Sequence, residues 1–231
     1  MNNNRIKAAL IDMDGTIYDS MRGHTAAWHR MMTELGVDTS RDEFYLYEGM
    51  TGQATIDLLF QRAFGRSASP QEAKELYSRK TRYFRETDEG KKMPDADRML
   101  SILKNNGITC VLVTGSGQRS LIEKVCCDFP GVFEPDKMIT SRDVVNGKPA
   151  PEPYLKAMEL VGVSPDECIV IENAPLGVQS GVAAGVFTIG ITTGPIPEEK
   201  MIEAGADVVY PSMSAFADSL PSLLQRLNDC D

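Results

Sequence analysis

The chain has 231 residues, of which 42% are hydrophobic and 25% charged, and its formal net charge is −9. This length is enough to bury a sizeable core, in one large domain or two smaller ones. The negative charge and the lack of a long Lys/Arg block argue against nucleic acid or an anionic membrane as a partner. No apolar run approaches the length that spans a bilayer, and nothing near Met1 resembles a signal peptide, so we expect a cytoplasmic protein.

The cysteine pattern agrees with a reduced compartment. The five cysteines form no CxxC pair and show no metal-ligand spacing; they are Cys110, Cys126, Cys127, Cys168 and Cys230. Cys110 and Cys168 fall inside predicted strands, where we expect them to be small core residues. We also expect a monomer.

The first predicted strand is the apolar run over residues 8–11, which is followed by Asp12, Met13, Asp14, Gly15 and Thr16. An apolar run of this kind predicts a buried strand of a parallel sheet. Ligand sites in open α/β sheets lie beyond the carboxyl ends of the strands, so both carboxylates should stand at a site. In a strict strand, Asp12 and Asp14 would also share a face. The alternative is a solvated acidic turn.

Residues 18–90 differ from the rest because apolar residues recur there at helical spacing and no strand is predicted. Asp19 can cap a first helix that runs through His24 and ends near Gly36. Further helices are predicted over Asp42–Leu46, Gln53–Phe64 and Pro70–Arg85.

From Asp95 onward, predicted helices alternate with short apolar strands. The strands are Ile108–Val113, Met138–Thr140, Cys168–Ile171, Val186–Ile191 and Val208–Tyr210, and the helices are Ala96–Lys104, Ser120–Cys127, Tyr154–Val161, Leu176–Ala184 and Ser214–Asn228. This alternation predicts right-handed βαβ units and a parallel sheet covered on both faces. The expected fold is a doubly wound α/β core, residues 1–17 and 91–231, into which an all-helical cap, residues 18–90, is inserted.

Several of the predicted strands end in reactive side chains. Thr114-Gly115-Ser116 follows one strand and Glu172-Asn173 follows another, while Lys148 precedes a Pro-marked helix start. Each feature alone has an ordinary explanation, as a helix cap, a turn or a solvated lysine. Together with the acids of the first strand, they favour a single site at the carboxyl edge of the sheet.

This order of features resembles the haloacid dehalogenase superfamily over essentially the whole chain: DxDGT, a Thr/Ser after a strand, a Lys, and an acidic position before a Gly-rich helix. The helical insert and the run over residues 172–178 resemble the β-phosphoglucomutase-like branch. The resemblance implies a phosphoryl-transfer enzyme that uses Mg²⁺ and an aspartyl-phosphate intermediate. There is no G-x-G-x-x-G after the first strand, which argues against a nucleotide-binding Rossmann enzyme.

The resemblance also implies roles for the strand-end acids. Asp12 would be the nucleophile and supply a side-chain oxygen to Mg²⁺, and Asp14 would supply its backbone carbonyl. The Asp14 carboxyl would protonate the leaving oxygen and then take a proton from the attacking water. Asn173 would be a further metal ligand, and Glu172 would hold metal-bound water. Relatives commonly carry an acid where this chain has Asn173, and an amide brings no charge to the metal.

The remaining core residues would bind the transferred phosphoryl group. Thr114 and the backbone N–H groups near Gly115 and Ser116 would hold its oxygens. Lys148 would neutralise charge in the transition state. Phosphoryl transfer requires mainly positioning and electrostatic stabilisation, which this set supplies.

The cap must set the substrate, because the cores of this superfamily are alike. In the phosphoglucomutases of this branch, a cap Arg holds the distal phosphate of a sugar bisphosphate, and Gly52 stands where we expect that Arg. Glu48 adds an acid nearby, which can face a phosphate only if a metal or its hydrate lies between them. The alternative is that Glu48 points to solvent.

Two further cap residues are matched by family position. Lys80 is the expected phosphate contact on the last cap helix, ahead of Arg79 and Arg82. His24 matches a hinge His of the mutases, although structural packing is the default explanation for an isolated His on a core-like helix.

The sequence therefore predicts a Mg²⁺-dependent phosphohydrolase acting on a small phosphorylated substrate. It resembles an inorganic pyrophosphatase of this superfamily, and pyrophosphate is the favoured substrate. The alternatives are a β-phosphoglucomutase or a small sugar-phosphate phosphatase and, from another class, a phospho-accepting receiver or binding module without turnover. The linkers over 15–20 and 87–93 are a plausible hinge for the cap.

Overall fold

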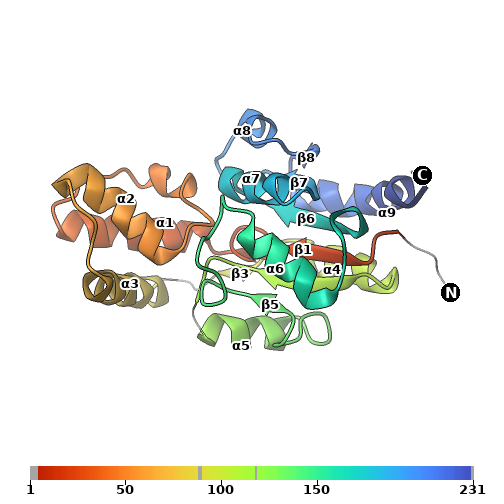
Figure 1. The fold of residues 1–231 in the computed structure, drawn as a ribbon, viewed down its shortest axis with the longest axis horizontal. Helices are drawn as coiled ribbons and strands as arrows, with labels where there is room; N and C mark the ends of the chain where they lie inside the picture. Colours follow the sequence, from red (N-terminus) through yellow and green to blue (C-terminus); the bar gives the residue numbers. More distant parts are fainter. Residues whose placement is uncertain (1–4, 88–89, 118, 230–231) are drawn as a thin grey trace.

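The computed structural model describes residues 5–87, 90–117 and 119–229. Its main sheet has six parallel strands in the order β5-β4-β1-β6-β7-β8 (Figure 1). The strands are β1 (Ala8–Ile11), β4 (Thr109–Val113), β5 (Met138–Ile139), β6 (Cys168–Glu172), β7 (Phe187–Ile191) and β8 (Val208–Tyr210). The predicted parallel sheet is confirmed, and β1 lies at its centre between β4 and β6.

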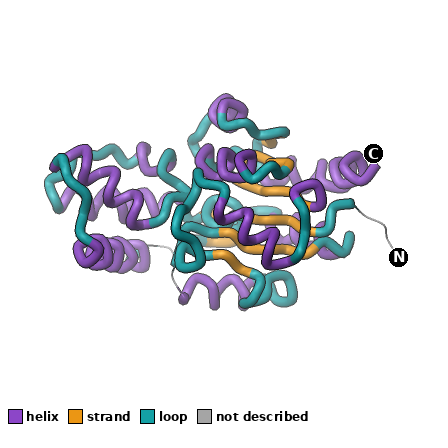
Figure 2. The backbone as a smooth tube through the Cα atoms, viewed as in Figure 1, coloured by secondary structure: helices purple, strands orange, loops and turns teal. Residues whose placement is uncertain are grey.

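Alternate residues of the central strand enter two different cores. Ala9 and Ile11 belong to one core, and Ala8 and Leu10 belong to the other. This is the period of a strand that is buried on both faces. Helices α4 (Ala96–Asn105), α5 (Arg119–Asp128) and α9 (Met213–Asp229) contribute to the first core, and α6 (Glu152–Val161) contributes to the second. Figure 2 shows helices on both sides of the strands, as the doubly wound prediction requires.

Two further helices flank the strands β6, β7 and β8. Helix α7 (Pro175–Ala183) contacts β6 and β7, and the short helix α8 (Glu198–Glu203) lies next to α7. Neither α8 nor the 3₁₀ helix η2 (Pro165–Glu167) is predicted from the sequence. Both are short, so each offers too few residues for a helical period to appear. The other predicted elements of the core agree with the structure to within one or two residues at each end.

The inserted segment forms a helical cap beside the sheet (Figure 1). It consists of α1 (Met21–Glu34), the 3₁₀ helix η1 (Asp42–Tyr45), α2 (Gly52–Phe64) and α3 (Pro70–Arg85). Helix α3 starts where local chemistry requires it, because the Ser69 hydroxyl accepts from the Glu72 N–H and the Glu72 carboxylate accepts from the Ser69 N–H. Trp28, Met31 and Met32 bury the inner face of α1 in the larger core.

The cap joins the core through a two-stranded ribbon that the sequence does not predict. Strand β2 (Tyr18–Asp19) pairs antiparallel with β3 (Lys91–Lys92). Asp19 therefore belongs to a strand, and its predicted role as the cap of α1 is wrong. Ser20 holds that position without a side-chain capping bond. Part of the second predicted hinge linker, residues 88–89, lies outside the described residues.

The described cysteines are free thiols, and Cys110 in β4 and Cys168 in β6 are buried as predicted. Cys230 lies outside the described residues. Within the part of the chain that the structure describes, no helix is both long and apolar enough to cross a membrane.

Candidate active site

The core residues of the predicted site meet at the carboxyl edge of the sheet. Asp12 directly follows β1, and Glu172 is the last residue of β6. The Lys148 ammonium lies between their carboxylates, with Nζ 2.6 Å from Asp12 Oδ1 and 2.5 Å from Glu172 Oε1. Its third hydrogen bond goes to the carbonyl oxygen of Val113 at 3.1 Å. All three donors of this buried cation are thus used inside the protein.

This group of charges is out of reach of solvent, and its ionisation reflects that. Burial raises the pKa of Asp12 to about 7, the Glu172 charge adds to the shift, and Lys148 opposes it. Burial also opposes the charge on Lys148, but Asp12 and Glu172 outweigh it and raise the pKa of this amine above its usual value. Lys148 is therefore a permanent cation beside the predicted nucleophile.

The Asp14 carboxylate faces Ser20 and His24 instead of Lys148. Because β1 ends at Ile11, the strict alternation that would place Asp12 and Asp14 on one face does not extend to them. Asp14 Oδ1 accepts from the Ser20 hydroxyl at 2.6 Å and lies 3.0 Å from His24 Nε2. The two acids thus have separate partners, which suits them to separate tasks.

His24 connects Asp14 to Lys80. Its Nδ1 lies 2.5 Å from Lys80 Nζ, and an ammonium has donors only, so Nδ1 must accept and Nε2–H must donate to Asp14. Burial and the Lys80 charge lower the pKa of His24, which agrees with a neutral ring. The ring also stacks on Phe84, with 3.9 Å between the ring centroids. Packing, the default explanation for His24, therefore accounts for one of these three contacts.

The pKa values of the groups at the two ends of this chain of hydrogen bonds are both lowered, which favours the charged form of Asp14 and disfavours that of Lys80. Burial opposes ionisation of Asp14, but His24, Ser20 and Lys80 outweigh it and lower the pKa of the carboxyl. Burial lowers the pKa of Lys80 to about 8, while Asp14 opposes that shift. Lys80 is 3% exposed, and its ammonium lies over aromatic rings of the cap.

The loop after β4 lies directly under the cap. Thr114 Oγ1 accepts from the Ser116 N–H at 3.0 Å, and both residues are buried. A Cβ on Gly115 would come within 2.9 Å of the carbonyl oxygen of Gly49, which belongs to the cap loop. Only a residue without a side chain allows this approach, so the cap is closed on the core here.

Glu48 enters the site from the same cap loop, and the solvent-facing alternative is wrong. Its side chain is buried, and Oε1 accepts from Asn173 Nδ2 at 3.0 Å. Oε2 is buried as well and has no hydrogen-bond partner among the described residues. Burial and the Asp12 charge raise the pKa of Glu48 well above its usual range. The Glu48 carboxylate therefore has a buried oxygen that can still accept a hydrogen bond or bind a cation.

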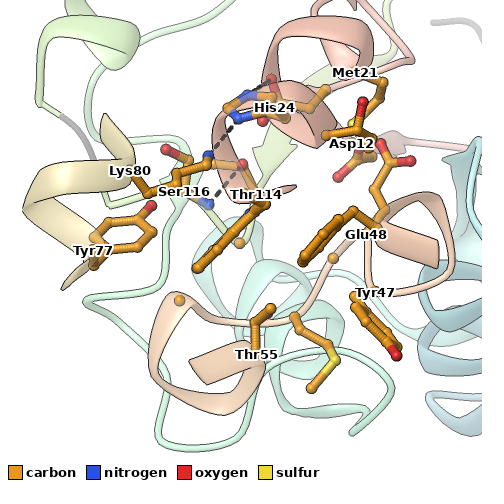
Figure 3. A pocket seen from close by; sticks show the side chains of 18 residues that line it. Asp12, Met21, His24, Tyr47, Glu48, Thr55, Tyr77, Lys80, Thr114 and Ser116 are labelled. Carbon is orange, nitrogen blue, oxygen red and sulfur yellow. Dashed lines mark hydrogen bonds and ion pairs between the residues drawn. The ribbon is translucent and has the colours of Figure 1, made fainter. Parts of the chain in front are cut away.

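A pocket lies between cap and core, and Figure 3 shows its lining residues. Asp12 and Glu48 lie on one side of that view, and Lys80 and Tyr77 lie on the other. Lys80 lines the pocket, whereas Arg79 and Arg82, the other two cations weighed as the phosphate contact on this helix, do not. A Cβ on Gly52 would lie only 2.2 Å from Tyr77 Cδ2, so the Tyr77 ring fills the space that a side chain at position 52 would need.

Three residues with polar contacts at the site are missing from the sequence prediction. Tyr77 lies one turn before Lys80 on α3, and this i, i+3 spacing is the signal that places both on one helix face. Ser20 and Tyr154 bond the carboxylates of Asp14 and Glu172, respectively. No local pattern marks either one, because each reaches its partner only through the tertiary fold.

The chain belongs to the haloacid dehalogenase-like hydrolase family, whose sequence profile matches residues 6–185. It is therefore an enzyme of the phosphatase type of that family. Among its relatives, the "Putative pyrophosphatase PpaX" of Clostridium perfringens is 31% identical, over 96% of this chain and 99% of the relative. Hexitol phosphatase A of Escherichia coli is 30% identical, over 81% of this chain and 83% of the relative.

The structure comparison finds the same architecture. A "Putative beta-phosphoglucomutase from Bacteroides vulgatus" has a TM-score of 0.93 and 42% sequence identity, and the match covers 97% of this chain and 91% of that chain. The predicted doubly wound core with its inserted helical cap is thereby confirmed. A receiver domain, which has no such insert, is set aside.

Proposed function

We propose that this protein is a Mg²⁺-dependent phosphohydrolase that forms an aspartyl-phosphate on Asp12 and hydrolyses inorganic pyrophosphate to two phosphates. In this proposal residues 18–90 are the cap domain, and residues 1–17 and 91–231 are the catalytic core. The proposal depends most on the closed pocket, where Tyr77 occupies the space above Gly52 and Glu48 is buried against Asn173.

We assign one or more residues to each step of the proposed reaction. An Asp12 oxygen attacks phosphorus and the bond to the leaving oxygen breaks, while Lys148, already 2.6 Å from Asp12, balances the charge. Thr114 and the N–H groups near Gly115 and Ser116 hold the phosphoryl oxygens. Asp14 is the acid–base group, and its lowered pKa keeps it ionised in the free protein, ready to take a proton from the water that cleaves the acyl phosphate. It would protonate the leaving oxygen only for a substrate whose leaving group needs a proton, after taking one up itself.

The donor set fits a magnesium ion. Four carboxylates, those of Asp12, Asp14, Glu48 and Glu172, line or adjoin the pocket, and burial together with the neighbouring negative charges raises the pKa values of Asp12 and Glu48. The unpaired Glu48 oxygen is a further vacant donor. Mg²⁺ prefers oxygen ligands of this kind, and it would supply charge neutralisation between Asp12 and the phosphoryl group.

Asp12, the Asp14 carbonyl, Asn173 and Glu48 would hold the ion, and Glu172 would hold its water. Within the described residues, no three His, Cys, Asp or Glu side chains are arranged around one point to bind a metal. An amide and a backbone carbonyl in the donor set account for that, since neither is a side chain of those types. Asn173 Oδ1 accepts from the Thr16 hydroxyl at 3.2 Å, which orients the amide.

Pyrophosphate is favoured over a sugar phosphate because the cap leaves little room for a leaving group. Lys80 is the cation with which the cap lines the pocket, and it can pair with a second phosphate. An acid at position 48 tolerates that phosphate only through a cation between them. The leaving phosphate also needs little protonation at neutral pH.

The test is a substrate screen with pyrophosphate, hexose and triose phosphates and nucleotides, measured as phosphate release with Mg²⁺. Pyrophosphate should have the highest kcat/KM, and Asp12→Asn should abolish turnover of every substrate. Faster turnover of a sugar phosphate would contradict the substrate assignment. Trapping with beryllium fluoride should place the fluoride complex on Asp12.

A sugar-phosphate phosphatase or β-phosphoglucomutase is the second candidate. It is favoured by the similarity to Hexitol phosphatase A and to the protein titled as a β-phosphoglucomutase. A coupled assay that detects conversion of β-glucose 1-phosphate to glucose 6-phosphate would establish the mutase. Gly52, in place of the expected Arg, argues against it.

A further inference from the structure

A buried tyrosine outside the pocket bonds the charged cluster of the site from behind. Tyr154 lies on α6, its side chain is fully buried, and its hydroxyl donates to Glu172 Oε1 at 2.7 Å. Its ring centroid lies 5.3 Å from Lys148 Nζ. Tyr154 is absent from the pocket lining, so any effect on the reaction must pass through another residue.

Tyr154 contacts Glu172 Oε1, the oxygen that competes with Asp12 for the Lys148 ammonium. Glu172 Oε1 receives both the Tyr154 hydroxyl and the Lys148 ammonium, while Oε2 receives the Asn173 N–H at 3.1 Å. A Cβ on Gly177 would overlap this carboxylate, so the Glu172 side chain packs closely against the backbone of α7. Lys148 is thereby shared between Glu172 and the nucleophile Asp12.

The Tyr154 hydroxyl keeps its proton at neutral pH and is therefore a hydrogen-bond donor. Burial, together with the charges of Glu172 and Asp12, raises the pKa of this phenol well above its usual value. Its hydrogen bond therefore spreads the negative charge of Oε1 over a second donor, and Glu172 attracts the ammonium less strongly.

We propose that Tyr154 is a positioning residue that, through Glu172, keeps the Lys148 ammonium directed at Asp12 and the phosphoryl group. Without the hydroxyl, Oε1 has the ammonium as its remaining side-chain donor and draws it away from the reaction. The inference rests on the proposed aspartyl-phosphate chemistry but does not depend on pyrophosphate being the substrate.

The experiment measures the rate at which Asp12 is phosphorylated by acetyl phosphate with Mg²⁺, followed by intact-protein mass. Tyr154→Phe keeps the ring and removes one hydrogen bond to a charged group, so we expect the maximal rate of phosphorylation (kcat for this step) to fall about ten-fold, with the half-saturating acetyl phosphate concentration (KM) nearly unchanged. Tyr83→Phe is the matched control, because Tyr83 is also buried and its hydroxyl donates to Glu34 in the cap. It should react at the wild-type rate.

A double-mutant cycle with Glu172→Gln tests whether Tyr154 acts through Glu172. Since Gln has no charge with which to attract Lys148, Tyr154→Phe should have little further effect in that background. An equal effect in both backgrounds, or no effect of Tyr154→Phe in the wild type, would overturn the inference. If Glu172→Gln does not fold, Tyr154→Phe alone decides. A loss of kcat/KM that comes entirely from a higher KM, with kcat unchanged, would mean that Tyr154 affects binding and would also overturn the inference.

The two proposals fail in different ways. A wild-type protein that is phosphorylated by acetyl phosphate but does not hydrolyse pyrophosphate leaves the positioning role intact and removes the substrate assignment. A wild-type protein that forms no phosphoenzyme removes the proposed chemistry and, with it, the role of Tyr154.

Discussion

Replacing Glu48 by Gln should stabilise the protein without metal and weaken its response to Mg²⁺. In the structure Glu48 is buried, one of its oxygens has no partner, and the Asp12 charge opposes its ionisation. Relieving a buried, unsatisfied charged group is worth at least about 1 kcal/mol, or a rise in melting temperature of about 2–4 °C for a chain of this size.

The sign of the pH dependence follows from the direction of the pKa shift. Burial raises the pKa of Glu48 in the folded state above the 4.5 of the free side chain, so the folded state binds this proton more tightly than the unfolded state. The wild type therefore loses stability as the pH rises above about 4.5, until the folded-state carboxyl ionises. The advantage of Glu48→Gln should vanish below that pH and be largest near neutrality.

Magnesium should remove this advantage. A ligand at 100 times its Kd stabilises a protein by about 2.7 kcal/mol, and a ten-fold weaker Kd leaves about 1.4 kcal/mol of that. If Glu48 helps to hold the ion, the wild type should gain about 1 kcal/mol more than the variant, which cancels the difference seen in EDTA. Differential scanning calorimetry in EDTA and in excess Mg²⁺ measures both quantities.

The control is Glu75→Gln, because Glu75 is exposed on α3 and away from the site. It should leave both melting temperatures unchanged. Equal stabilisation of wild type and Glu48→Gln by Mg²⁺ would refute a metal contact for Glu48. Equal stability in EDTA at neutral pH would refute the claim that the buried, unsatisfied Glu48 carboxyl destabilises the folded protein.

Three other perturbations test the cap and the acid–base pair. Burial lowers the pKa of Lys80 to about 8, so kcat/KM should fall as the pH rises through 8 and the ammonium loses its charge. Lys80→Met should abolish this fall, and a wild-type kcat/KM that is constant between pH 7 and 9 would contradict the prediction. Tyr77→Ala should open the space above Gly52 and raise kcat/KM for hexose phosphates relative to pyrophosphate; an unchanged ratio would mean that this ring does not limit substrate size. Asp14→Asn should lower kcat about 10²–10⁴-fold while substrate binding persists, as measured by steady-state kinetics; full activity would exclude Asp14 as the acid–base group.

The predictable parts of the fold are those with strong local signals. Helix α3 has the predicted bounds because Ser69, Pro70 and Glu72 form a complete start signal. The ribbon of β2 and β3 could not be predicted, since each strand has two residues and their pairing depends on a contact across the whole insert. For the same reason Asp19, which looks like a helix cap locally, is a strand residue.

The site shows the same division between what is local and what is tertiary. That Asp12, Lys148 and Glu172 lie together follows from the rule that ligands bind at the carboxyl ends of parallel strands. The direction of the Asp14 carboxylate, toward His24, depends on where α1 leaves the ribbon, which no local pattern specifies. The burial of Glu48 likewise depends on the cap being closed on the core.

Trp28 is the one tryptophan in the chain, and it is 9% exposed on the pocket side of α1, where it lies 5.3 Å from the Lys80 ammonium and stacks with Phe44. All tryptophan fluorescence of the protein therefore comes from one residue, which lines the pocket between cap and core. Any event that hydrates that chamber or moves its charged lysine will change the colour or intensity of the emitted light. Intrinsic tryptophan fluorescence can thus report ligand binding in the pocket without a dye or a label.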